Sequence, residues 1–178
     1  GDQTMPRLDL QQHLQDLEKA GLLVRVDRPI NKDTQLHPLV RWQFLGGIPA
    51  DDRRAFLFTN VIDAKGRKYD MPVVVGAFSA SARIYALGMG QKVEDIGNAW
   101  LKAIQNPIPP VRVEHAACQE VVVTGAALRE KGGGVAALPV PISTPGFDAA
   151  PYPTRTLCVT RDPATGVQTM GTYRAGLK

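Results

Sequence analysis

The sequence predicts an α+β protein, in which helices and strands mix in the first part of the chain and strands prevail in the last part. Three observations support this class. Two segments with amphipathic helical spacing lie before residue 110. Strand-like runs occur among them without the regular strand–helix alternation of a doubly wound sheet. The chain ends in two alternating segments around a tight turn, which is the pattern of a β-hairpin.

The first helix is expected within "LDLQQHLQDLEKAG", with Asp9 as its N-cap and Gly21 as its stop. His13 falls on the polar side of this helix, opposite an apolar face made by Leu10, Leu14 and Leu17. Residues 22–30 alternate as a half-buried strand. A short helix is expected at residues 35–45, and strands at 55–61 and 71–78 are joined by a turn at Gly66.

A second amphipathic helix is expected in "QKVEDIGNAWLKAIQN", which ends before "PIPP" because proline cannot continue a helix. Its apolar face consists of Val93, Ile96, Trp100, Ala103 and Ile104. The run "QEVVVT" at residues 119–124 then predicts a strand. The Gly- and Pro-rich connection after it is long, and such connections are usually functional or mobile. The final hairpin turns at residues 162–166, where Pro163 and Gly166 suit a type I turn closed by a left-handed glycine.

Composition restricts the classes of function. The 178 residues carry a net charge of +4, but the basic residues form no stripe with aromatic residues, so we expect no nucleic-acid partner. No apolar run has membrane-spanning length and no signal peptide is visible, which predicts a cytoplasmic protein with no membrane partner. Residues 1–4, before Met5, are interpreted as a cloning remnant. The chain is long enough for one domain, or one and a half small ones.

The isolated reactive side chains favour structural roles. Cys118 and Cys158 are far apart in apolar surroundings, which predicts two buried free thiols. His13, His37 and His115 show no metal-ligand spacing and are interpreted as non-ligands. The "GGG" at residues 132–134 lacks the rest of a phosphate-binding motif and is interpreted as a linker.

The hairpin is the most specific stretch of the chain. Gly171 lies inside a strand, where a glycine permits a bulge or the close approach of a ligand. Arg174 follows it and could bind a phosphate or a carboxylate with two hydrogen bonds. Spacing alone favours the simpler alternative of a solvent-exposed hairpin with a surface arginine. Asp148, in the preceding connection, is either a turn residue or an acid of a site.

Residues 118–178 resemble the UbiD family of decarboxylases, which use prenylated FMN. The shared features are a strand ending at Gly125, the "LPVP" step at 138–141, an acid at Asp148, "YPT" at 152–154, "TRDPATG" at 160–166 and a strand ending in "YR" at 173–174. The part from Met5 onward also fits, with lower specificity. The resemblance implies a small α/β region at 5–110 and the start of an FMN-binding split β-barrel at 111–178, incomplete at the C-terminus. It also implies that the chain is the N-terminal fragment of a longer protein.

The resemblance implies roles for four hairpin residues. Arg174 stands at the position of the family's catalytic arginine, and Thr172, Tyr173 and Arg174 would contact the flavin. The family's acids lie beyond residue 178. Family members hold Mn²⁺, with K⁺ nearby, through an Asn five residues before the arginine. Thr169 occupies that position here, so we expect no metal ligand in this chain.

The implied activity is non-oxidative, reversible decarboxylation of an aromatic, heteroaromatic or α,β-unsaturated carboxylic acid, free or linked to CoA, through covalent chemistry on prenylated FMN. The partner would be this small-molecule acid, and the full-length protein would be a homo-oligomer. Two alternatives stay open. One is a flavin-binding split-barrel module without decarboxylase activity, and the other is a non-catalytic subunit that a separate chain completes.

Overall fold

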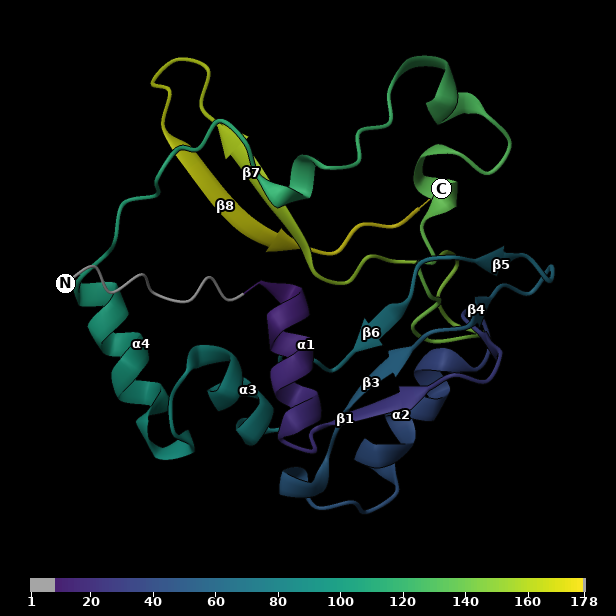
Figure 1. Ribbon diagram of the computed structural model, residues 1–178, viewed down its shortest axis with the longest axis horizontal. Helices are drawn as coiled ribbons and strands as arrows, with labels where there is room; N and C mark the ends of the chain where they lie inside the picture. The colour runs from purple at the N-terminus through teal and green to yellow at the C-terminus, as the bar shows by residue number, and fades with distance from the viewer. Residues whose placement is uncertain (1–8, 178) are drawn as a thin grey trace.

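The computed structural model describes residues 9–177 and consists of four α-helices, eight short strands and five 3₁₀ turns (Figure 1). The helices are α1 (Leu10–Lys19), α2 (Leu36–Leu45), α3 (Ala82–Met89) and α4 (Ile96–Gln105). The strands are β1 (Leu23–Val26), β2 (Ile30–Asn31), β3 (Ala55–Phe58), β4 (Val61–Ile62), β5 (Lys68–Tyr69), β6 (Val73–Val75), β7 (Thr156–Arg161) and β8 (Gln168–Tyr173).

The strands form three small sheets. The first has the order β1-β3-β6, with β1 parallel and β6 antiparallel to β3. The second has the order β2-β4-β5, again with one parallel and one antiparallel pair. The third is the hairpin β7-β8. The parallel pairs are connected through α2, and the mixed sheets confirm the α+β class. Residues 9–177 do not close a barrel.

Helix α1 begins and ends where its capping residues predict. The Asp9 carboxylate accepts a hydrogen bond of 2.8 Å from the Gln12 N–H, which satisfies one of the free donors of the first turn. Gly21, just past the C-cap, adopts a left-handed φ of 68°. The placement of His13 on a polar side was wrong. Its side chain is 3% exposed and stacks parallel to the Phe78 ring, with 5.3 Å between ring centroids.

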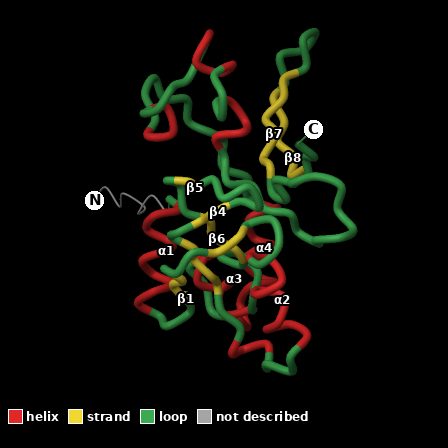
Figure 2. Tube along the Cα trace, turned by 90° about the vertical axis from the view of Figure 1, so that its right-hand side faces the viewer, coloured by secondary structure: helices red, strands yellow, loops and turns green. Residues whose placement is uncertain are grey.

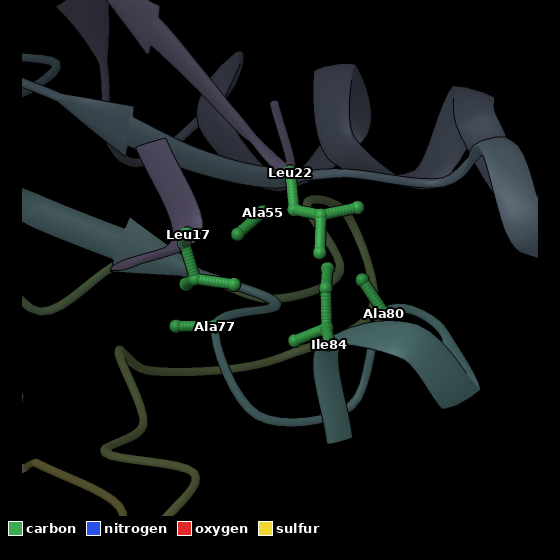
Figure 3. Close-up of a cluster of buried hydrophobic side chains, with 6 residues drawn as sticks. All are labelled: Leu17, Leu22, Ala55, Ala77, Ala80 and Ile84. Atoms are coloured by element: carbon green, nitrogen blue, oxygen red, sulfur yellow. The ribbon is translucent and has the colours of Figure 1, made fainter. Parts of the chain in front are cut away.

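Two apolar cores cover the two faces of the first sheet. Figure 3 shows the first, where α1 and α3 pack on one face through Leu17, Leu22, Ala55, Ala77, Ala80 and Ile84. On the other face, α2 packs through Ile30, Leu36, Val40, Phe58, Val61 and Tyr69. The alternation of β3 explains this division, because Ala55 and Phe58 fall on opposite faces. The result is a three-layer unit that fixes α2 rigidly against the sheet.

Helix α4 forms as predicted, but its apolar face is uncovered. None of its residues is buried, and Trp100 is 49% and Ile104 70% exposed. Its one side-chain hydrogen bond to a neighbouring helix runs from Trp100 Nε1 to the Tyr85 hydroxyl in α3, at 2.7 Å. Among the described residues, no helix is long and apolar enough to cross a membrane.

The strand predicted at residues 119–124 was wrong. This segment is irregular and follows a 3₁₀ turn at Ala117–Gln119, and Val121, Val122 and Val123 are exposed. β-branched residues favour a strand only when a neighbouring strand pairs with it, and no described segment pairs here. The prediction of two buried thiols was also wrong, because Cys118 is exposed and Cys158 is only half-buried. The described residues after 110 therefore contain strands only in the hairpin, and not throughout as the sequence predicted.

The hairpin is confirmed. Thr156 pairs with Tyr173 and Arg161 with Gln168, so the two strands are in full antiparallel register. Gly166 has a φ of 72°, and the Asp162 carboxylate accepts hydrogen bonds from the Ala164 and Thr165 N–H groups. These two bonds are the main reason that the pKa of Asp162 lies below its ordinary value. Figure 2 shows the hairpin projecting from the three-layer unit.

Candidate functional site

Arg174 lies immediately after β8, where the hairpin returns to the body of the molecule. Its guanidinium Nη2 donates to the Asp148 carboxylate at 3.0 Å. Its central carbon lies 4.1 Å from the centroid of the Tyr152 ring, which is cation–π geometry. The Arg174 side chain is 51% exposed, and Nη2 is the nitrogen that hydrogen-bonds within the described residues. The group is therefore held on two sides and still offers N–H donors to an anionic ligand.

The loop at residues 144–148 determines the orientation of Asp148. The second carboxylate oxygen of Asp148 accepts a 2.8 Å hydrogen bond from the Thr144 N–H, and the Asp148 N–H donates to the Thr144 carbonyl at 2.9 Å. Gly146, with a φ of 87°, permits the tight turn between them. The Asp148 side chain is only 17% exposed. Asp148 therefore closes a turn, which is one of the two roles that the sequence left open, and it also contacts Arg174.

Helix α2 holds this loop from the other side. Arg41 Nη2 donates to the Thr144 hydroxyl at 3.0 Å and to the Ser143 carbonyl at 3.3 Å. His37, one turn earlier, is half-buried, and burial is the main reason that its pKa lies below the ordinary 6.5. The positive charge of Arg41 lowers it further, while the negative charge of Asp148 opposes the shift. A neutral imidazole near neutral pH follows from these causes.

Single backbone hydrogen bonds connect the segments around Arg174 to one another and to the end of β2. The Ile142 N–H donates to the Lys32 carbonyl beside β2, at 3.2 Å. The Tyr152 N–H donates to the Pro141 carbonyl, and the Ala175 N–H donates to the Pro153 carbonyl. Residues 138–142, 151–153 and 175–177 therefore lie side by side as extended segments. The loop that carries Asp148 is held against α2 through Arg41, while the Arg174 side chain stays half exposed.

One cavity borders these segments and a second borders the hairpin. One of about 690 Å³ lies between α2, the start of β6 and the 138–155 segment, and it is lined largely by apolar residues together with His37, Tyr152 and Arg155. The other, of about 450 Å³, lies between α3, α4 and the hairpin, and Trp100, Leu157 and Thr172 line it. Both have the apolar walls and few polar groups that are typical of small-molecule sites.

The four hairpin residues singled out in the sequence do not share one face. Thr172 pairs with Leu157 and faces the α3–α4 cavity. Thr169 and Tyr173 lie on the opposite face, beside Thr160 and Thr156. The Tyr173 ring folds back over Gly171, where a Cβ would come within 2.5 Å of it. A ligand on one face that touches residues 172–174 must therefore use backbone groups of at least one of them.

The described residues do not fit a metal site. No group of three or more His, Cys, Asp or Glu side chains in residues 9–177 could hold a metal ion. Thr169 pairs with Thr160, so its neighbour across the strand is another hydroxyl and not a carboxylate or an imidazole.

The sequence singled out Arg174 and Asp148, but it gave no sign that Arg41 holds the loop of Asp148 or that the Tyr152 ring lies against Arg174. Arg41 contacts a loop about one hundred residues away, and no local pattern signals such a contact. Tyr152 could have been suspected from "PYP", because a residue before a proline is restricted to extended backbone conformations.

Comparison with known proteins agrees with this architecture. The family model of the 3-octaprenyl-4-hydroxybenzoate carboxy-lyase N-terminal domain matches residues 14–104. An evolved dimeric form of the UbiD-class enzyme HmfF from Pelotomaculum thermopropionicum, solved with prFMN, is 28% identical with a TM-score of 0.74. The match covers 93% of this chain and 35% of that one. The same enzyme solved with FMN is 27% identical, with a TM-score of 0.68, and here 93% of this chain matches 33% of that one.

The vanillic acid decarboxylase of Sedimentibacter hydroxybenzoicus in its closed form shares the fold, at 24% identity and a TM-score of 0.72, over 96% of this chain and 35% of that one. The chain thus spans about a third of the length of these solved structures. The family model covers the three-layer unit and ends within α4, and the structural matches extend over the hairpin as well. The chain belongs to the UbiD family of carboxy-lyases.

Proposed function

We propose that this chain is the N-terminal part of a non-oxidative decarboxylase that acts on an aromatic, heteroaromatic or α,β-unsaturated carboxylic acid with prenylated FMN. The observation that carries the proposal is the half-exposed guanidinium of Arg174, held between Asp148 and Tyr152 at the end of β8. A fixed guanidinium with free N–H donors is suited to a planar carboxylate.

The cavity between α3, α4 and the hairpin supports the assignment of a flavin. Thr172 lines an apolar cavity of about 450 Å³ together with Trp100 and Phe78, which could hold a flat ring system, and Arg174 follows two residues later. We assign Thr172, Tyr173 and Arg174 to cofactor contact, with at least one of them acting through its backbone. Prenylated FMN, when bound, supplies the electron sink for loss of CO₂.

The role of Arg174 in the reaction follows from charge. A guanidinium close to the substrate carboxylate aligns the bond to be broken and replaces the water that would otherwise solvate the anion. When neutral CO₂ departs, the guanidinium no longer faces a carboxylate charge. Arg174 therefore contributes by binding and orienting the substrate. The Asp148 carboxylate keeps the local charge near zero after the product has left.

The test uses the full-length protein that carries this chain. It is loaded with prenylated FMN under anaerobic conditions and offered a panel of aromatic, heteroaromatic and unsaturated acids, and CO₂ release is measured. Arg174→Ala is expected to abolish turnover. The matched control is Arg161→Ala at the other end of the hairpin, where the side chain donates to Gln168 on the neighbouring strand, and this variant is expected to keep activity.

Retained turnover in Arg174→Ala would show that the assignment of this residue is wrong. Flavin binding without CO₂ release from any acid would favour the alternative of a flavin-binding module. The 178-residue chain by itself is expected to release no CO₂ and to hold prenylated FMN weakly, because it spans a third of the related enzymes and leaves the α4 and hairpin faces uncovered.

A further inference from the structure

We propose that Asp148 is a positioning residue for Arg174, and that Arg41 of α2 anchors the loop that carries Asp148. This inference rests on the proposed function of Arg174 as the carboxylate-binding group. It adds a series of contacts that lead from the three-layer unit to the Arg174 guanidinium. The first and third links are hydrogen bonds between parts of the molecule that are far apart in sequence, and the second lies within one loop.

The first link joins α2 to the loop. Arg41 donates to the Thr144 hydroxyl at 3.0 Å and to the Ser143 carbonyl at 3.3 Å, so one guanidinium nitrogen holds two consecutive residues. Helix α2 is itself packed into the second core through Leu36 and Val40, which are 0% and 4% exposed. The anchor therefore belongs to a rigid element, whereas the loop that it holds has no regular structure.

The second link fixes the carboxylate within the loop. One oxygen of Asp148 is occupied by the Thr144 N–H at 2.8 Å, which leaves the other oxygen to face Arg174 at 3.0 Å. The same threonine thus receives Arg41 and orients Asp148. The hydrogen bond from the Thr144 N–H therefore orients the Asp148 carboxylate, and through this carboxylate the loop influences where the Arg174 guanidinium lies.

The third link is the pair with Arg174. Arginine has a long side chain that loses rotational entropy when it is held in one conformation. The ion pair with Asp148 and the Tyr152 ring at 4.1 Å impose this restriction before any ligand arrives. A ligand carboxylate then meets a guanidinium that is already oriented, and this preorganisation favours productive binding.

The test measures how fast the Arg174 side chain reacts with a labelling reagent in the absence of flavin. Phenylglyoxal modifies accessible arginines, and peptide mass spectrometry gives the rate at each one. In the wild-type protein, Arg174 is expected to react more slowly than Arg161, whose side chain donates to Gln168 on the same hairpin. Asp148→Ala is expected to raise the Arg174 rate several-fold and to leave the Arg161 rate unchanged. Arg41→Ala should raise it as well, while Asp148→Glu restores a slow rate.

Activity gives the second measurement. In the full-length enzyme, Asp148→Asn is expected to lower kcat/KM by roughly 10- to 100-fold, which is the size that one charge-assisted hydrogen bond supports, with an unchanged melting temperature. An unchanged Arg174 rate in Asp148→Ala overturns the proposal. So does an equal rise at Arg161 and Arg174, since that result would mean a general loss of structure. Because the labelling needs neither flavin nor substrate, its outcome is independent of whether the enzyme decarboxylates any acid.

Discussion

Replacement of His13 provides the most direct test of how α1 is held to the rest of the molecule. The imidazole lies between two segments of the first core. Its Nε2 is 2.6 Å from the Ala77 carbonyl, its ring stacks on Phe78, and a Cβ at Gly88 of α3 would come within 3.2 Å of it. Only 3% of the His13 surface is exposed, so removal of the ring leaves a buried cavity.

The size of the effect follows from these contacts. His13→Ala removes a buried ring and leaves a cavity, and it also removes the partner of a buried carbonyl. Truncation of large buried side chains costs about 2–5 kcal/mol, and a buried polar group that loses its partner costs about 1–3 kcal/mol. We expect a loss of about 3 kcal/mol in the free energy of unfolding. For a chain of this length this corresponds to a melting temperature lower by roughly 6–12 °C.

A second variant separates the two contributions. His13→Phe keeps the ring and its stacking but cannot hydrogen-bond to the Ala77 carbonyl, so we expect about 1–2 kcal/mol of destabilisation. The control is His115→Ala, an exposed histidine for which a change within about 0.5 kcal/mol is expected. Urea unfolding followed by circular dichroism measures all three. If His13→Ala costs no more than His115→Ala, the buried and stacked placement of His13 is refuted.

Three further predictions concern other parts of the chain. Gly97→Ala in α4 is expected to stabilise the protein by about 1 kcal/mol in urea unfolding, because its Cβ meets nothing within 4 Å; Gly90→Ala, at a φ of 61°, should destabilise it. Because the pKa of His37 is lowered in the folded state, the unfolded state binds more protons at this residue. The contribution of His37 to the free energy of unfolding is therefore complete above pH 6.5 and is lost as the pH drops through the folded-state pKa. His37→Gln should flatten this dependence in urea midpoints measured between about pH 7.5 and 5. Thr169→Asn in the full-length protein is expected to increase Mn²⁺ binding, measured by metal analysis after gel filtration, and an unchanged metal content would contradict the expectation.

Local chemistry explains which elements could be predicted. The α1 boundaries depend on Asp9 and Gly21, which act within one turn of the helix, and the hairpin depends on the turn at 162–166. Both signals are complete in a few consecutive residues. The "QEVVVT" run failed because β-branched residues indicate a strand only where a partner exists, and the described chain supplies none.

The burial of His13 was missed because periodicity counted the imidazole as polar. Leu17, four residues later on the same side of α1, is 0% exposed, so the spacing itself contained the signal. Only the tertiary partners, the Ala77 carbonyl and the Phe78 ring, show why a histidine suits this position. Residues that combine an apolar ring with one hydrogen bond are where a simple polar–apolar pattern is least informative.

The sequence "PYP" at residues 151–153 shows how backbone chemistry prepares the site. In an extended segment, the carbonyls of residues 151 and 153 face one edge of the segment, and the backbone N–H and carbonyl of residue 152 face the opposite edge. The Pro151 and Pro153 carbonyls accept from the Leu177 and Ala175 N–H groups, while the Tyr152 N–H donates to the Pro141 carbonyl on the opposite edge. Because proline has no N–H, the edge that faces residues 175–177 can accept hydrogen bonds but cannot return them.

The contact between this segment and the end of the hairpin therefore has only half of the bonds of an ordinary antiparallel ladder. Side chains must provide the rest of the attachment, and those nearest are the Tyr152 ring and the Asp148 carboxylate, both on Arg174. The same contacts that hold the guanidinium ready for a carboxylate thus also hold the hairpin end to the body of the molecule. We therefore expect that a strongly binding anion that draws Arg174 away from Asp148 would also loosen this attachment of the hairpin end.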